Sequence, residues 1–388
     1  MAPMNLTSRE ILDKLISFPT VSSESNLELV EWVETYLASH GVESTRIYDE
    51  TGTKASVYAN VGPEVEGGVV LSGHTDVVPV EGQDWDTDPW TVVEKDGRLY
   101  GRGTTDMKGF DALALAAVPK ALAAGIKKPI QIAFSRDEEI GLLGAIDLVR
   151  DMRPALPEAS AVIIGEPTEM KVVSGHKASD LLLVHVRGFE VHSSIMHEGV
   201  SAIMVASQLI NWLREQTVNN MNETPNEMDA LFYPPFTTLH VGRISGGTAG
   251  NITARDCRFE VDIRTVPSQD GTLWFDRFRA FASEIERDMQ KINPETFIDI
   301  DLAIVCPGVR PEENGAAEQL ARQLTGDNAV NTVSYGTDGG HFQKGGYSTV
   351  ICGPGDIALA HQPNEFITID QFQKGEVFLD KLIEKLAE

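Results

Sequence analysis

Cysteines and basic residues are scarce in this chain of 388 residues. Its three cysteines, Cys257, Cys306 and Cys352, are far apart and form no C-x-x-C pair, which excludes a disulfide framework and a cysteine zinc site. Lysine and arginine total 32 against 58 aspartates and glutamates, so the net charge is −26. A surface so acidic repels phosphate backbones and anionic lipids, and we therefore expect no binding to nucleic acids or membrane surfaces.

Long apolar stretches and several familiar enzyme motifs are also absent from the sequence. No stretch reaches the ~18 uninterrupted apolar residues of a membrane span, and the opening MAPMNLTSREILDKL lacks an apolar signal region. We therefore expect a cytoplasmic location. The sequence has no P-loop, no H-E-x-x-H and no dinucleotide-binding fingerprint, so no motif suggests the enzyme classes that they mark.

The pattern that remains is that of an α/β protein. Apolar strand-like runs occur at SVYANV, GGVVLSGH, PIQIAFS and SAVIIGE, and helical patterns separate or flank them, as at Lys108–Ala124. Strands that alternate with helices predict a mixed, mostly parallel sheet with helices on both faces. We assign residues 1–178 and 307–388 to this domain.

A different order of elements occupies residues 179–306. Strand patterns at LLLVHVRG, TTLHVGRIS, RFEVDIRTV and TFIDIDLAIV, with helical patterns at GVSAIMVASQLINW and TLWFDRFRAFASEIERDMQKI, follow the order β-α-β-β-α-β. This order is typical of a ferredoxin-like module. The sequence therefore predicts an α/β domain that is interrupted by an inserted ferredoxin-like α+β domain.

Histidines and carboxylates gather where the predicted strands end and beside glycine-rich turns. These residues are His74, Asp76, Asp106, Asp137, Glu138, Glu139, Glu166 and His361. Ligands of open α/β sheets bind at the carboxyl ends of the strands. Imidazole nitrogens and carboxylate oxygens bind zinc at about 2.0–2.2 Å. Five such ligands suit two metal ions about 3.5–4 Å apart that share a carboxylate, and a further carboxylate can serve as general base.

Each of these residues also has a structural interpretation. His74 alone is typical of a hydrogen-bonded structural histidine, and Asp137–Glu139 alone of a helix start. Asp106 is compatible with a helix cap, Glu166 with a loop carboxylate before proline, and His361 with an exposed turn. Their shared position favours a metallohydrolase, and spacing alone goes no further than that class.

Five motifs resemble those of a known enzyme family. SGHTDVVP, YGRGTTDMKG, SRDEEIG, IGEPTE and AHQPNE, in this order, are similar to motifs of the zinc-dependent aminoacylase and dipeptidase family. That family includes acetylornithine deacetylase, succinyl-diaminopimelate desuccinylase and the carboxypeptidase G type. The resemblance covers essentially the whole chain and implies a metal-dependent amidohydrolase with two zinc ions, which cobalt can replace. It also implies a homodimer, with a lid and dimerisation role for residues 179–306.

The resemblance implies a metal ligand at five positions. His74 and Glu166 would hold one zinc ion, Glu139 and His361 would hold the other, and Asp106 would bridge them. Thr105 departs from the family pattern, in which cysteine or another small residue is common, but it is not among the ligands.

The resemblance implies further catalytic and binding roles. Asp76 would orient the first histidine ligand, and Glu138 would be the general base. His192 in GFEVHSS would stabilise the oxyanion, usually from the partner subunit. Asn251 in GGTAGNIT and Arg264 in VDIR would bind the substrate, the latter through its α-carboxylate.

Two of these assignments have alternatives. The residues before His192 (Glu190 and Val191) depart from the commoner small residues, and His197 lies nearby, so a surface histidine is the other interpretation. The alternative for Arg264 is a salt bridge at the strand edge.

Other segments indicate the branch of the family. TGTKASVYANVGP, VPVEGQDWDTDPW, TDGGHFQKGG and GPG followed by AHQPNEF are similar to acetylornithine deacetylases. We therefore expect hydrolysis of N2-acetyl-L-ornithine to L-ornithine and acetate, a step of arginine biosynthesis. The alternative is a succinyl-diaminopimelate desuccinylase or a general N-acyl-amino-acid amidohydrolase or dipeptidase. The residue that meets the substrate's side-chain ammonium stays open: Asp338 is one candidate, and a structural role in its glycine-rich loop is the other interpretation.

Overall fold

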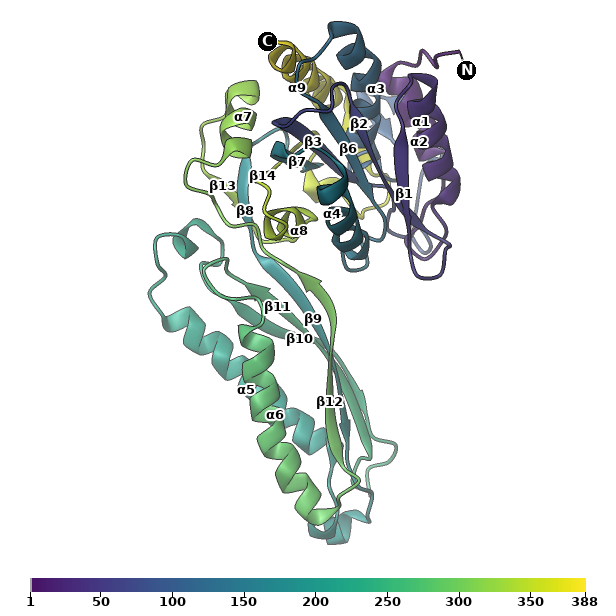
Figure 1. The fold of residues 1–388 in the computed structure, drawn as a ribbon. Helices are drawn as coiled ribbons and strands as arrows, with labels where there is room; N and C mark the ends of the chain where they lie inside the picture. The colour runs from purple at the N-terminus through teal and green to yellow at the C-terminus, as the bar shows by residue number, and fades with distance from the viewer. Residues whose placement is uncertain (1) are drawn as a thin grey trace. The chain divides into compact units, whose positions relative to one another are not determined.

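The computed structural model describes residues 2–388 as two compact units (Figure 1). The first unit contains the chain through Gly175 together with Pro311–Thr332 and Thr337–Glu388, and the second contains His176–Arg310 and Val333–Gly336. Each unit has its own hydrophobic core.

The first unit is built on an eight-stranded sheet. In spatial order its strands are β1 (Ser44–Tyr48), β2 (Ala55–Val61), β6 (Ile130–Ser135), β3 (Gly68–His74), β7 (Ala159–Pro167), β14 (Thr349–Gly353), β8 (Val173–His176) and β13 (Asn331–Val333). The four central strands, β6, β3, β7 and β14, run parallel, whereas β1, β2 and β8 pair with their neighbours antiparallel. The predicted mixed α/β fold is therefore confirmed.

Helices bury the central strands. They are α1 (Ser8–Ile16), α2 (Leu27–Ser39), α3 (Lys108–Ala124), α4 (Leu143–Ala155), α7 (Ala316–Thr325), α8 (Gly339–Lys344), η3 (Ile357–Leu359) and α9 (Ile369–Ala387). Helix α3 packs against both α1 and α9, and α4 packs near α8. All residues of β3 and β6 are buried, as expected of parallel strands that are covered on both faces. A small sheet of β15 (Phe366–Thr368), β5 (Arg98–Tyr100) and β4 (Val93–Lys95) completes the unit.

The second unit has the predicted order β-α-β-β-α-β. Its elements are β9 (Ala178–Arg187), η1 (Ser193–Glu198), α5 (Ala202–Asn222), η2 (Asp229–Leu231), β10 (Thr238–Gly246), β11 (Asp256–Thr265), α6 (Leu273–Ile292) and β12 (Phe297–Cys306). The strands form an antiparallel sheet in the order β10-β11-β9-β12. Alternate residues of β9 and β11 are buried in one core with α5 and α6.

No helix within residues 2–388 is long and apolar enough to cross a membrane.

Candidate metal centre

Three parallel strands end at one edge of the main sheet. His74 is the last residue of β3 and pairs in register with Ser135, the last residue of β6. Glu166 lies near the end of β7, which is parallel to β3 on its other side. Glu138 and Glu139 follow β6 after two residues. Because parallel strands point the same way, these side chains converge at one edge, where α/β sheets bind their ligands.

Asp106 lies between the two histidines of this edge. Its Oδ1 atom is 3.0 Å from Nε2 of His74, and its Oδ2 atom is 3.2 Å from Nε2 of His361. Asp106 is buried and lies two residues before α3. A carboxylate that reaches two histidines through different oxygens has the arrangement expected of one that bridges two metal ions.

Each histidine has a glutamate of its own. Glu166 Oε1 is 3.7 Å from Nε2 of His74, and Glu139 Oε2 is 3.0 Å from Nε2 of His361. The structure thus brings the five predicted ligands together as two pairs that share one aspartate. Glu138 also belongs to this cluster, because ligand atoms of His74, Glu138 and Glu166 lie within 4.8 Å of one another. Glu138 therefore lies beside the pair of His74 and Glu166.

The carboxylates of the cluster are crowded and shielded from water. Burial raises the pKa of Glu139 to about 7, and the charge of Asp106 adds to this rise. Burial and then the charge of Asp106 likewise raise the pKa of Glu166 well above its ordinary value. Hydrogen bonds to Asp106 and Glu139 raise the pKa of His361 to about 10. Positive charge between Asp106 and Glu139 is therefore strongly favoured.

The residues of the cluster fit a pair of divalent cations. Within the described residues 2–388, Oε1 of Glu139 is buried and has no hydrogen-bond partner. A buried carboxylate oxygen without a partner is costly, and a cation supplies such a partner. The two imidazole nitrogens and the carboxylates of Asp106, Glu139 and Glu166 are a ligand set that suits zinc.

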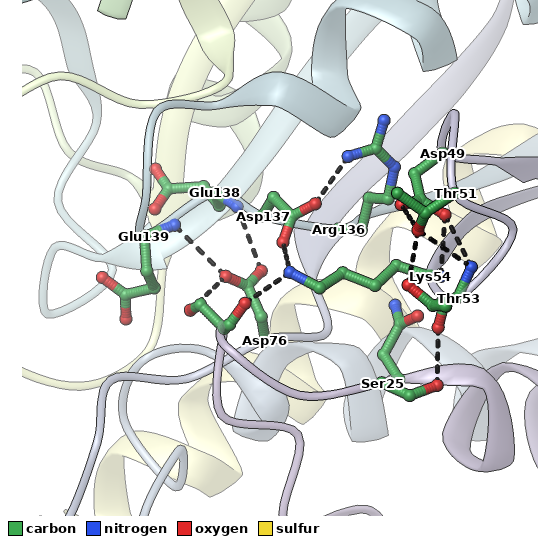
Figure 2. A network of polar contacts seen from close by, with 12 residues as sticks. Ser25, Asp49, Thr51, Thr53, Lys54, Asp76, Arg136, Asp137, Glu138 and Glu139 are labelled. Carbon is green, nitrogen blue, oxygen red and sulfur yellow. Dashed lines mark hydrogen bonds and ion pairs between the residues drawn. The ribbon is translucent and has the colours of Figure 1, made fainter. Parts of the chain in front are cut away.

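Asp76 holds the segments around the cluster by two means. Nδ1 of His74 is 2.9 Å from the backbone carbonyl oxygen of Asp76. Because a carbonyl only accepts, Nδ1 carries the proton and Nε2 is left to bind a metal. The carboxylate of Asp76 is farther from the ring, with Oδ1 3.8 Å from Nδ1. Instead it accepts the backbone N–H groups of Glu138 at 3.0 Å and of Glu139 at 3.3 Å (Figure 2).

Glu365 supports the cluster, although the sequence analysis gave it no role. Its carboxylate accepts the backbone N–H groups of Thr105 at 2.8 Å and of Asp106 at 3.1 Å, and it pairs with the buried Arg102 at 2.7 Å. The loop that carries the central aspartate is thereby fixed. The signal was present in the sequence, because Glu365 ends the AHQPNE motif that begins one residue before His361.

Asp338 lies next to the same sheet edge. Its Oδ2 atom accepts a hydrogen bond of 2.5 Å from the hydroxyl group of Ser135 at the end of β6. Burial raises the pKa of Asp338 to about 7. Its Oδ1 atom is buried without a hydrogen-bond partner among residues 2–388. Oδ1 of Asp338 is therefore available to accept a hydrogen bond near the cluster.

The second unit carries the three other predicted residues, and two of them lie together. The backbone N–H of Ser193 donates to the carbonyl oxygen of Asn251 at 2.8 Å, and His192 forms an antiparallel bridge with Ile252. The ring of His192 is exposed, with Nδ1 2.7 Å from the hydroxyl oxygen of Ser194. His192 and Asn251 are thus held on two paired segments of one loop cluster.

Arg264 lies at the opposite end of the second unit's sheet. The segment of His192 pairs with the residues just before β11, whereas Arg264 is next to the last residue of that strand. At ~3.3 Å per residue, the path along β11 from Asp256 to Arg264 is about 26 Å. The guanidinium of Arg264 makes hydrogen bonds of 2.8 and 3.1 Å with Asp262. Within one second unit, therefore, Arg264 does not meet His192 and Asn251.

Comparison with known proteins shows the family of this chain. The profile of Peptidase family M20/M25/M40 matches residues 70–385. An acetylornithine deacetylase of Myxococcus xanthus is 33% identical over 380 residues, which are 97% of this chain and 96% of that one. The acetylornithine deacetylase of Pasteurella multocida is 32% identical over 384 residues, 96% of each chain. These matches confirm the family predicted from the motifs.

Solved structures of low sequence identity share the fold. An M20 family metallo-carboxypeptidase of Sulfolobus solfataricus has a TM-score of 0.77 at 20% identity, covering 98% of this chain and 99% of that one. A dinuclear metal binding peptidase of the M20 family from Bacillus subtilis has a TM-score of 0.65 at 15% identity, with 98% and 97% covered. The chain is therefore a metal-dependent amidohydrolase and belongs to Peptidase family M20/M25/M40.

Proposed function

We propose that this protein is a di-zinc deacetylase that hydrolyses N2-acetyl-L-ornithine to L-ornithine and acetate, a step of arginine biosynthesis, in the cytoplasm. The observation that carries the proposal is the position of Asp106 between two histidines that each have a glutamate of their own. Relatives named acetylornithine deacetylase match nearly the whole chain and support the choice of substrate.

The metal ions would be held as two sites with one shared ligand. His74 and Glu166 would hold one zinc ion, His361 and Glu139 the other, and Asp106 both. When bound, the two ions polarise the amide carbonyl and acidify the attacking water. Cobalt accepts the same nitrogen and oxygen ligands and can replace zinc.

Glu138 moves the proton in this reaction. Its backbone is fixed by the hydrogen bond to Asp76, and its carboxylate lies beside His74 and Glu166. Glu138 accepts a proton from the attacking water as the new C–O bond forms. It then gives this proton to the leaving nitrogen as the C–N bond breaks, so that acetate and a free amine are released.

The positions of His192 and Arg264 support a homodimer. An N-acyl amino acid is far shorter than the path of about 26 Å that separates Asp256 from Arg264 along β11. One substrate molecule is therefore too short to contact both His192 and Arg264 of the same chain. In a symmetric dimer, Arg264 of one chain can bind the substrate carboxylate, while His192 and Asn251 of the other reach the same substrate. The exposed ring of His192 then donates a hydrogen bond to the developing oxyanion.

The substrate is tested by amine release from N2-acetyl-L-ornithine, N-succinyl-diaminopimelate and N-acetylmethionine in parallel. We expect the zinc-loaded protein to prefer acetylornithine strongly, and a chelator to abolish the reaction because the cluster then loses its cations. Preference for the succinylated substrate would instead assign the protein to the desuccinylases. Preference for acetylmethionine would identify a general amidohydrolase.

The general base is tested by Glu138→Ala. Removal of this carboxylate is expected to lower kcat by about 10²–10⁴-fold, because proton transfer is lost. Two zinc ions should stay bound, measured by elemental analysis. Glu64→Gln changes an exposed glutamate of the same unit and should leave kcat unchanged. Full activity of Glu138→Ala would contradict its role as base, and loss of zinc would make it a ligand.

The dimer is tested by complementation between two inactive subunits. His192→Ala and Arg264→Ala are each expected to be nearly inactive while they keep their zinc. A purified mixed dimer of the two should regain about half of the wild-type activity, because one of its two sites has both residues intact. A mixed dimer as inactive as its parents would show that both residues act within one chain. Loss of zinc from His192→Ala would show that His192 is a ligand.

A further inference from the structure

We infer that Lys54 is a positioning residue for the metal site: it holds Asp137 and thereby sets the backbone that carries Glu138 and Glu139. Lys54 lies directly before β2, and its Nζ atom is 2.5 Å from Oδ1 of Asp137. The inference rests on the proposed function only through the roles of Glu138 as base and Glu139 as ligand.

Both carboxylate oxygens of Asp137 accept hydrogen bonds from basic side chains. Its Oδ1 atom accepts a hydrogen bond from Lys54, and its Oδ2 atom accepts one of 2.5 Å from NH1 of Arg136. The backbone of Asp137 has a φ of +54°, in the left-handed region that residues with a β-carbon rarely adopt. Such a conformation persists when the surroundings impose it. The ion pair with Lys54 therefore helps to fix the turn that leads directly into Glu138.

A second chain of contacts joins Lys54 to the same segment. Nζ of Lys54 also donates to the backbone carbonyl oxygen of Ser22. The hydroxyl group of Ser22 donates to Oδ2 of Asp76 at 2.7 Å. The carboxylate of Asp76 accepts the backbone N–H groups of residues 138 and 139. Lys54 thus reaches this segment through Asp137 on one route and through Ser22 and Asp76 on the other.

The turn before Lys54 holds its backbone in place. Oδ1 of Asp49 accepts the N–H groups of Thr53 and Lys54, each at 2.9 Å, and the N–H of Asp49 donates to the carbonyl oxygen of Lys54. The hydroxyl group of Ser25 donates to the carbonyl oxygen of Thr53 at 2.6 Å. Figure 2 shows these contacts at the far end of the Lys54 side chain from its ammonium group. The ammonium group is therefore presented by a fixed backbone.

The ion pair is shielded, so its loss is not replaced by water. The side chain of Lys54 is 16% exposed and that of Asp137 is 5% exposed. Without Lys54, the carboxylate of Asp137 is left to Arg136 alone, and Arg136 also pairs with Asp147 at 3.1 Å. Removal of one partner from a buried ion pair leaves the other charge uncompensated, which destabilises the conformation that held the pair. The turn into Glu138 and Glu139 would then lose its fixed geometry.

The test is Lys54→Met, titrated with zinc alone against a chelator of known affinity. We expect about 10–100-fold weaker binding of the more weakly held zinc ion, the usual effect of removing a residue that orients metal ligands. We also expect kcat to fall with KM unchanged, because Glu138 is displaced while the substrate-binding residues are not. Lys54→Arg, whose guanidinium can donate to both acceptors, should restore most of the zinc affinity and kcat.

The matched control is Lys120→Met. Lys120 also belongs to the first unit and also forms ion pairs, with Asp380 at 2.8 Å and Glu376 at 3.3 Å, but these are on α9. This variant should keep the zinc affinity and kcat of the wild type. Wild-type zinc affinity in a folded Lys54→Met protein would overturn the inference.

A second variant covers the case in which Lys54→Met does not fold. Asp137→Asn keeps the shape of the side chain and removes its charge, and we expect the same loss of zinc affinity. Unchanged affinity in this variant would also overturn the inference. Because the zinc titration needs no substrate, failure of the wild type to deacetylate acetylornithine would contradict the proposed function and leave this test intact.

Discussion

Repulsion among buried carboxylates is the constraint on which this metal site depends. Glu138, Glu139 and Glu166 converge with His74 at one edge of the main sheet because β3, β6 and β7 are parallel and end together, and the loop before α3 adds Asp106. Carboxylates brought so close are stable only with positive charge among them. The chain itself supplies two histidines, and Asp106 contacts both of them through different oxygens. A pair of divalent cations is the natural complement of this arrangement.

Hydrogen bonds to the backbone are what make the cluster rigid. Asp76 accepts the N–H groups of Glu138 and Glu139, and Glu365 accepts that of Asp106. Lys54 extends this support outward to the turn between β1 and β2. Metal sites and catalytic carboxylates need such fixed geometry, because small displacements of the ligands are costly.

The sequence predicted the parts of the fold that depend on local pattern. Alternating strands and helices predicted the mixed sheet, and the order β-α-β-β-α-β predicted the second unit. Most of the side chains that cluster were found because they follow strand ends, and the resemblance to the family then implied the role of each. Partners that meet only through tertiary structure, such as Lys54 and Asp137, 83 residues apart, gave no local signal. The separation of Asn251 from Arg264 did have a local signal in the sequence, because RFEVDIRTV, which contains Arg264, was already predicted to be an extended strand.

The most direct test of the account is anomalous diffraction at the zinc edge from crystals of the zinc-loaded protein. The account predicts two peaks about 3.5–4 Å apart. Both should be bonded to Asp106, one also to His74 and Glu166 and the other also to His361 and Glu139. A single peak, or two peaks of which Asp106 contacts only one, would contradict the bridging arrangement and the di-zinc mechanism that rests on it.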